Sequence, residues 1–138
     1  SSSTNLKENI EIILNRGIRN ILIVEDSDIQ REICIAQLQQ IGFEKITGAT
    51  NGKEALEYLE NNSVDFILSD WNMPELNGLE LLKKVKGNTA LKDIPFLILT
   101  INNDEDKNQE ALNLGAIDYI VKPLMPDDLH FKIRKILY

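Results

Sequence analysis

The sequence predicts one α/β domain in which a parallel β-sheet carries helices on both faces. Five short apolar runs alternate along the chain with stretches of helical spacing, and each connection is long enough to hold a helix. Three of the runs are continuously apolar, which is typical of strands buried on both faces. The length of 138 residues is also close to that of one domain.

The apolar runs are the expected strands. The second run contains Thr47 and Gly48, so we expect it at an edge of the sheet. In chain order the five runs are Ile21–Val24, Ile46–Ala49, Phe66–Leu68, Phe96–Leu99 and Tyr119–Val121.

Five helices are expected between and after these strands. The first covers residues 27–41 and ends at Gly42, and the second begins at Asn51, which with Glu54 resembles a capping box. The others cover 77–86, 104–114 and 127–137. The apolar positions that define the first and the last helix are Ile29, Ile33, Cys34, Leu38 and Ile41, and then Leu129, Ile133, Ile136 and Leu137.

Residues 1–17 fall outside this repeat and are interpreted as a tag or linker with a short amphipathic helix, leaving 18–138 as the domain. Leu6, Ile10, Ile13 and Leu14 share one stripe of a helix over residues 4–17. A helix of about 12 residues is marginal alone in water, so it must dock. Its own domain, an upstream domain and a second copy in a homodimer all remain open as its partner.

The composition restricts the classes of function. Lys and Arg number 15 against 22 Asp and Glu, and the net charge of −7 argues against direct binding to nucleic acid. No apolar run approaches the roughly 20 residues of a membrane span, and no signal peptide is recognisable, so a cytoplasmic protein without membrane insertion is expected. Cys34 and His130 are single, which excludes an internal disulfide. The two residues either have structural roles only or form a Cys–His nucleophile pair.

Polar residues follow the expected strands at the end where parallel strands present their ligands. They are Glu25, Asp26, Asp70, Thr100 and Lys122. Clustered carboxylates repel by about 4 kcal/mol per pair at 4 Å and an effective dielectric of 20, and a hard cation such as Mg²⁺ relieves that repulsion. A carboxylate beside a metal, an ammonium and a hydroxyl suits phosphoryl transfer, with aspartate as the acceptor. The alternative is structural, because acidic residues at strand ends also cap helices.

One stretch of the chain resembles a known family. The residues Asp70-Trp71-Asn72-Met73-Pro74, followed by Gly78-Leu79-Glu80-Leu81-Leu82, are similar to the receiver domain of two-component response regulators, in particular to the single-domain chemotaxis type. The similarity extends from about Arg19 to Tyr138. It implies a flavodoxin-like fold with strand order 2-1-3-4-5, an order taken from the resemblance and not from the pattern.

The resemblance also implies roles for individual residues. Asp70 would be the phosphorylated aspartate, Thr100 and Lys122 would bind phosphoryl oxygens, and Tyr119 would be the aromatic switch residue. Mg²⁺ would be bound by Asp26, Asp70 and the backbone carbonyl of Asn72, with Glu25 acting through water. Such a domain is a switch and no turnover enzyme, since it promotes only its own phosphorylation and dephosphorylation.

The implied partners are a histidine kinase or histidine phosphotransfer protein as donor, and an effector protein or fused output domain as receiver of the signal. The face formed by residues 104–137 would contact the effector, and a homodimer could form through residues 4–17 or 104–137. Three positions depart from the family pattern: Glu25 replaces an aspartate, Asn77 stands where aspartate is frequent, and Ile101 stands where a small residue is usual.

Three other hypotheses remain at this point. The chain could be a pseudo-receiver that serves only as an interaction module, for which Ile101 is the best argument. It could be a haloacid-dehalogenase-like phosphatase, although Asn72 stands where that family needs a second aspartate. It could bind a flavin, although Glu25 and Asp26 would repel a phosphate after the first strand.

Overall fold

The computed structural model describes residues 20–73, 75–101, 105–122 and 125–137, and within them it contains five strands and five helices. The helix expected over residues 4–17 lies outside the described residues. In chain order the elements are β1 (Asn20–Val24), α2 (Asp28–Ile41), β2 (Lys45–Ala49), α3 (Gly52–Asn61), β3 (Phe66–Asp70), α4 (Gly78–Lys86), β4 (Phe96–Thr100), α5 (Glu105–Asn113), β5 (Asp118–Val121) and α6 (Pro126–Leu137).

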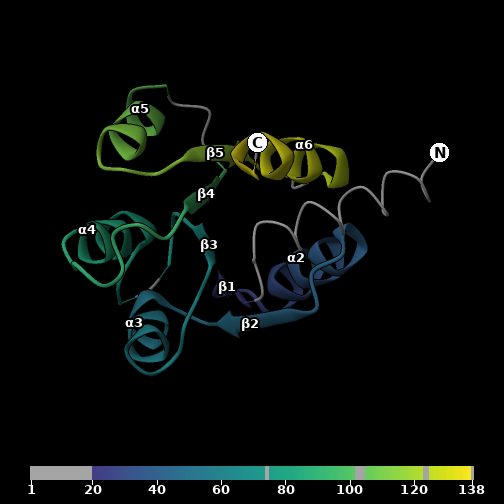
Figure 1. Ribbon diagram of the computed structural model, residues 1–138. Helices are drawn as coiled ribbons and strands as arrows, with labels where there is room; N and C mark the ends of the chain where they lie inside the picture. Colours follow the sequence, from purple (N-terminus) through teal and green to yellow (C-terminus); the bar gives the residue numbers. More distant parts are fainter. Residues whose placement is uncertain (1–19, 74, 102–104, 123–124, 138) are drawn as a thin grey trace.

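The strands form one parallel sheet in the order β2-β1-β3-β4-β5 (Figure 1). Each connection between successive strands contains a helix, as parallel pairing requires. The central strands β1, β3 and β4 are buried at every residue, whereas the edge strand β2 is exposed at Lys45 and Gly48. The fold class, the strand order and the edge position of the second strand are therefore confirmed.

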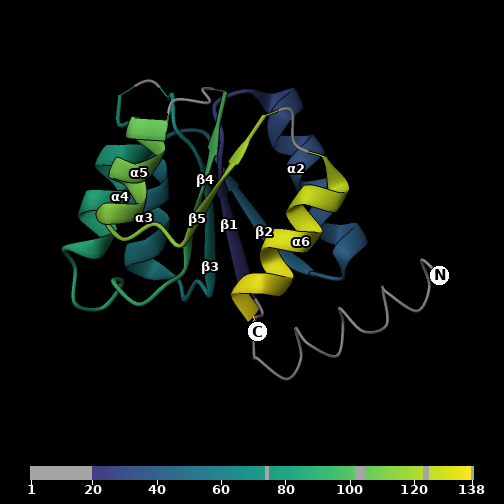
Figure 2. The ribbon, with the colours of Figure 1, turned by 90° about the horizontal axis from the view of Figure 1, so that it is seen from above.

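The helices form two layers on opposite faces of the sheet (Figure 2). α2 and α6 cover one face, and α3, α4 and α5 cover the other. Alternate residues of the strands supply two separate cores, so that Ile21 and Ile23 pack toward α2 and α6, while Leu22 and Val24 pack toward the other layer. Burying one such side chain is worth about 1.5–3 kcal/mol.

Side-chain caps fix where the helices begin, and hence where the connections from the strands end. Ser27 Oγ accepts a hydrogen bond from the backbone N–H of Gln30 at 3.3 Å, and Asn51 Oδ1 accepts one from Glu54 at 2.8 Å. Asn77 caps α4 in the same way. The cap expected at Asn51 is confirmed, and the connection between β1 and α2 is restricted to the three residues before Asp28.

Two expectations about the helices and strands need correction. Cys34, Leu38 and Ile41 face the core, but Ile29 and Ile33 are 71% and 42% exposed. The inward stripe follows i, i+4, i+7 from Cys34, and the residue preceding it lies about 100° around the helix. In addition, β3 runs two residues beyond the predicted strand, to Asp70, because its ladder with β4 continues there.

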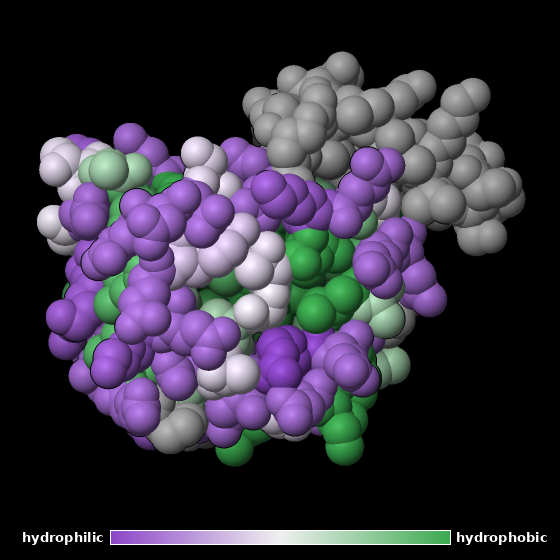
Figure 3. All heavy atoms as spheres, turned by 90° about the horizontal axis from the view of Figure 1, so that it is seen from below, coloured by the Kyte–Doolittle hydropathy of each residue, from purple (hydrophilic) through white to green (hydrophobic). Residues whose placement is uncertain are grey.

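The surface is mainly hydrophilic on the side seen from the β2 edge, with smaller hydrophobic areas between (Figure 3). Among the described residues, no helix combines the length and the apolar character needed to cross a bilayer.

Candidate functional site

Four strands deliver polar side chains to one edge of the sheet. Glu25 follows β1, Asp70 and Thr100 are the last residues of β3 and β4, and Lys122 follows β5. Since all these strands are parallel, their carboxyl ends meet at this edge. Glu25, Asp70 and Thr100 are 2%, 6% and 3% exposed, so these polar groups lie inside the protein surface.

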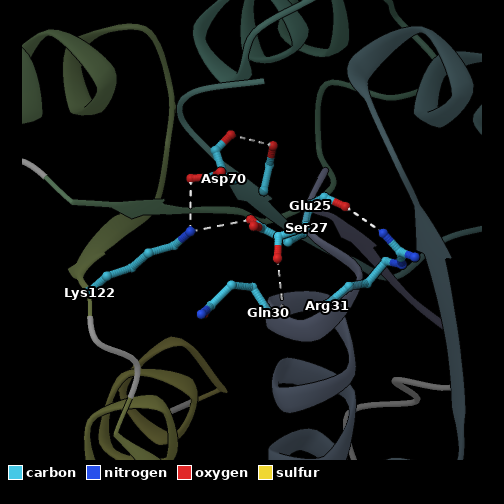
Figure 4. Close-up of polar contacts among 7 residues, drawn as sticks. Glu25, Ser27, Gln30, Arg31, Asp70 and Lys122 are labelled. Atoms are coloured by element: carbon cyan, nitrogen blue, oxygen red, sulfur yellow. Dashed lines mark hydrogen bonds and ion pairs between the residues drawn. The ribbon is translucent and has the colours of Figure 1, made fainter. Parts of the chain in front are cut away.

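Lys122 joins two of the carboxylates (Figure 4). Its Nζ lies 3.2 Å from Asp70 Oδ1 and donates a hydrogen bond to Glu25 Oε2 at 3.3 Å. The side chain of Lys122 is 14% exposed, and those of its partners are exposed by less than a tenth. Charge-assisted contacts with this little access to water are stronger than surface ion pairs.

The carboxylates of Glu25, Asp26 and Asp70 form one acidic cluster. One oxygen of each lies within 4.8 Å of the others, and Asp26 is the exposed member. Carboxylate oxygens around an opening to solvent suit a hard cation that keeps part of its hydration shell, as Mg²⁺ does. The donor chemistry of this cluster therefore fits the predicted metal.

The pKa of Glu25 reflects the excess of negative charge in the cluster. Burial, and then the negative charge and hydrogen bond of Asp70, raise the pKa of Glu25 from 4.5 to about 7, although Lys122 acts in the opposite direction. Burial by itself would lower the pKa of Lys122, but the two carboxylates outweigh it and that pKa is raised. One lysine does not compensate the cluster, so Glu25 is partly protonated at neutral pH.

Thr100 and Tyr119 lie on the face of the sheet that α5 covers. The backbone N–H of Lys122 donates to the Thr100 carbonyl at 2.6 Å, so these two residues adjoin. Tyr119 pairs with Ile98 in the β4–β5 ladder, and strand alternation places Tyr119 and Thr100 on the face covered by α5. Tyr119 is half-buried, and Lys132 Nζ lies 5.6 Å from the centre of its ring.

The connection after β3 is held close to the carboxyl end of that strand. Gly78 donates its N–H to the Trp71 carbonyl at 2.8 Å, and a Cβ atom at Gly78 would lie 2.3 Å from the carbonyl oxygen of Asp70. Only glycine permits this approach of α4 to the strand end. Asn72 lies exposed in this connection, and the use of its carbonyl as a metal ligand stays a prediction.

The structure gives no support to a Cys–His nucleophile pair. Cys34 is buried, and burial, followed by the charge of Glu25, raises the pKa of its thiol to about 11. A thiol of this kind is protonated at neutral pH and is a poor nucleophile.

Arg31 contacts the site but was not among the residues predicted from the sequence. Arg31 Nη1 donates to the backbone carbonyl of Glu25 at 2.8 Å. The one available signal was an arginine three residues after the acidic Asp28 on the first helix, and such pairs are common on helix surfaces.

The chain was compared with known proteins. Residues 21–134, which include all the site residues above, match the family described as response regulator receiver domain. Similar proteins include chemotaxis protein CheY1 of Helicobacter pylori, 38% identical over 118 residues, which cover 85% of this chain and 95% of that protein. Chemotaxis protein CheY-3 of Vibrio cholerae is 37% identical over 127 residues, covering 92% and 97%. The solved structure of Vibrio cholerae CheY4 has a TM-score of 0.79 at 33% identity, covering 86% of this chain and 98% of that one.

Proposed function

Because this chain belongs to the family of response regulator receiver domains, we propose that it accepts a phosphoryl group from a phosphohistidine donor onto the carboxylate of Asp70. Domains of this family are phosphorylation switches. Residues 18–138 form the switch domain in this proposal, and the cytoplasm is where we expect it to meet its donor. The family assignment leaves the phosphatase and flavin-binding hypotheses without support.

The contact of Lys122 with both Asp70 and Glu25, beside the acidic cluster, is the observation that carries this proposal. It gives Asp70 a neighbouring fixed cation, and the adjoining carboxylates support binding of a divalent cation beside it. Phosphoryl transfer depends mainly on positioning and on charge stabilisation, and these groups supply both.

The chemical step needs little from the protein beyond this arrangement. An oxygen of Asp70 bonds to phosphorus while the bond from phosphorus to the donor imidazole nitrogen breaks, and the imidazole takes up a proton. Lys122 then exchanges its contact with the Asp70 carboxylate for a phosphoryl oxygen, and the Thr100 hydroxyl donates to another. Asp26, Asp70 and the backbone carbonyl of Asn72 would hold Mg²⁺, with Glu25 acting through water, and the ion would supply further neutralisation of the transferred group.

The signal leaves through the side of the molecule that contains α5, β5 and α6. Phosphorylation adds about −1.5 to −2 of charge at Asp70, which draws Thr100 toward the phosphoryl group and lets Tyr119 turn inward. A pocket of about 230 Å³ already adjoins this tyrosine. Its lining consists of Tyr119, Ile120, Val121, Asp128, Phe131 and Lys132.

Partners follow from this mechanism. A histidine kinase or histidine phosphotransfer protein would deliver the phosphoryl group, and an effector protein or fused output domain would contact residues 104–137. Direct contact with nucleic acid and insertion into membranes are not part of the proposal. A homodimer through residues 104–137 is compatible with the same face, whereas one through residues 4–17 involves positions outside the described structure.

Mass spectrometry after incubation with acetyl phosphate and Mg²⁺ tests the acceptor. The parent protein should gain the mass of one phosphoryl group in a base-labile linkage, and Asp70→Asn should gain none. Asp93→Asn is a matched control, because it makes the same chemical change at an exposed position. Asp93 lies before β4, at the amino ends of the strands and away from the site. Labelling of Asp70→Asn would move the acceptor elsewhere. A folded parent that takes up no phosphoryl group would favour the pseudo-receiver.

A further inference from the structure

Arg31 on α2 holds the backbone that carries two of the acidic residues (Figure 4). Its Nη1 donates to the Glu25 carbonyl at 2.8 Å, and its Nη2 pairs with the carboxylate of Asp28. The side chain of Arg31 is 17% exposed, against 84% for that of Asp28. The contact with the Glu25 carbonyl is thus the better protected of the two, and it is directed at the connection that leads into the site.

This contact fixes the peptide that joins Glu25 to Asp26. The N–H of Glu25 donates to the Ala49 carbonyl at 3.0 Å, so the residue is held by β2 on one side and by Arg31 on the other. The Glu25 carbonyl shares a rigid plane with the backbone nitrogen of Asp26. The direction in which the chain enters Asp26 is therefore set by the guanidinium, although Asp26 itself is exposed and belongs to no helix or strand.

Gly48 leaves the space through which the arginine reaches this carbonyl. A Cβ atom at Gly48 would lie 2.9 Å from Arg31 Cδ, closer than real Cβ atoms approach other atoms, and 3.3 Å from its Nε, which is a tight contact. The stem of Arg31 therefore crosses the edge strand β2 in direct contact with it. A methyl group at this strand position would displace the stem without removing the guanidinium.

We infer that Arg31 is a positioning residue for the cation site, which keeps Asp26 within reach of the carboxylates of Glu25 and Asp70. This inference rests on the proposed function, because it concerns how well the cluster binds Mg²⁺. Groups that orient the ligands of a metal commonly change its affinity by 10- to 100-fold when they are removed. Arg31 itself needs no contact with the metal to have this effect.

The direction of the change in Mg²⁺ affinity on replacing Arg31 distinguishes a positioning role from a simple electrostatic effect. Arg31 is a cation near a cation site, so loss of its charge alone would strengthen Mg²⁺ binding. Loss of its hydrogen bond frees the Glu25–Asp26 peptide and would weaken the same binding. The two explanations predict changes in opposite directions, so one titration decides between them.

The experiment is a titration of the full chain with Mg²⁺ alone, followed by the fluorescence of Trp71 and by calorimetry, together with the unfolding midpoint of each metal-free variant. We expect Arg31→Ala to bind Mg²⁺ about tenfold more weakly than the parent. Gly48→Ala should weaken binding in the same direction, without loss of stability, since alanine suits a strand better than glycine. Arg31→Lys, which retains the charge but not the forked donors, should fall between the parent and Arg31→Ala.

Lys53→Ala is the matched control, because it removes an exposed positive charge at the start of α3, which lies at the carboxyl ends of the strands like the site. It should leave Mg²⁺ binding unchanged or slightly tighter. Arg31→Ala and Gly48→Ala with the affinity of the parent, or a tighter one, would overturn the inference. A parent that binds no Mg²⁺ would instead contradict the proposed function. Should Arg31→Ala not fold, Gly48→Ala and Arg31→Lys decide the question by the same criterion.

Discussion

Replacing Glu25 by glutamine should stabilise the metal-free protein while weakening the site. Glu25 is 2% exposed, next to the carboxylate of Asp70, and its pKa of about 7 records the cost of charging it there. Glutamine resembles the protonated form of this side chain, so the variant avoids that cost at every pH. It also lacks the negative charge that a divalent cation needs, so its affinity for Mg²⁺ should fall.

The magnitude follows from the two pKa values. The pKa is 4.5 in the unfolded chain and about 7 in the folded one, and at 1.36 kcal/mol for each pKa unit the difference is about 3 kcal/mol. Between these values the folded chain binds more protons than the unfolded chain, so stability falls as the pH rises. The contribution of protonated Glu25 is complete below pH 4.5 and is lost as the pH passes through about 7.

Urea unfolding of the parent and of Glu25→Gln, with a chelator present and at several pH values from 5 to 8, measures this difference. Trp71 is the single tryptophan of the sequence and reports the transition. The two proteins should converge toward pH 5, and the variant should be more stable by up to about 3 kcal/mol at pH 8. Parallel pH profiles with a constant gap would refute the raised pKa of Glu25. Addition of Mg²⁺ should stabilise the parent more than the variant at pH 8.

Three further changes test the end of β3, the hydrophobic core and the residue that follows β4. Gly78→Ala should reduce labelling by acetyl phosphate, measured by mass spectrometry, because its Cβ would lie 2.3 Å from the Asp70 carbonyl oxygen and must displace that strand end. Leu82→Ala should lower the free energy of unfolding by about 2–5 kcal/mol in urea titrations, since this fully buried side chain leaves a cavity. Ile101→Ala should speed labelling and leave stability unchanged, because the 69% exposed Ile101 directly follows the last residue of β4, where the bulk of its side chain would hinder access to Asp70. Ile117→Ala, at another exposed isoleucine, is its control, and equal labelling rates of the parent and Ile101→Ala would contradict this hindrance.

Much of the fold was predictable because burial on both faces leaves continuous apolar runs. The central strands read as such runs, and Thr47 with Gly48 marked β2 as an edge. The strand order was not contained in the pattern, because a helical connection of the same length reaches the neighbouring strand on either side; it came from the resemblance. Periodicity also overstated the buried face of α2, where Ile29 and Ile33 precede the inward stripe and are exposed.

The acidic residues and the lysine of the site were predictable for a geometric reason. In a parallel sheet the residue after each strand is carried to the same edge, so Glu25, Asp70 and Lys122 could be expected together although up to 97 positions separate them. Arg31 could not be found in this way. Its partner is a backbone carbonyl, which any residue possesses, and its path depends on the absence of a side chain at Gly48.

The charge balance of the site explains why these groups occur together. Three ionised carboxylates and one ammonium leave a formal charge of about −2, which one proton relieves in part and a divalent cation neutralises. Under the proposed function, converting Asp70 to an acyl phosphate replaces one negative charge by about two, so the occupied site again carries an excess of negative charge. The single positive charge of Lys122 cannot balance the charges of Glu25 and a phosphoryl group at once. Under the same proposal the excess would draw a further donor inward, and the hydroxyl of Thr100 at the end of β4 is the proposed donor. The excess of negative charge that raises the pKa of Glu25 in the resting protein is thus the same excess that would drive the switch.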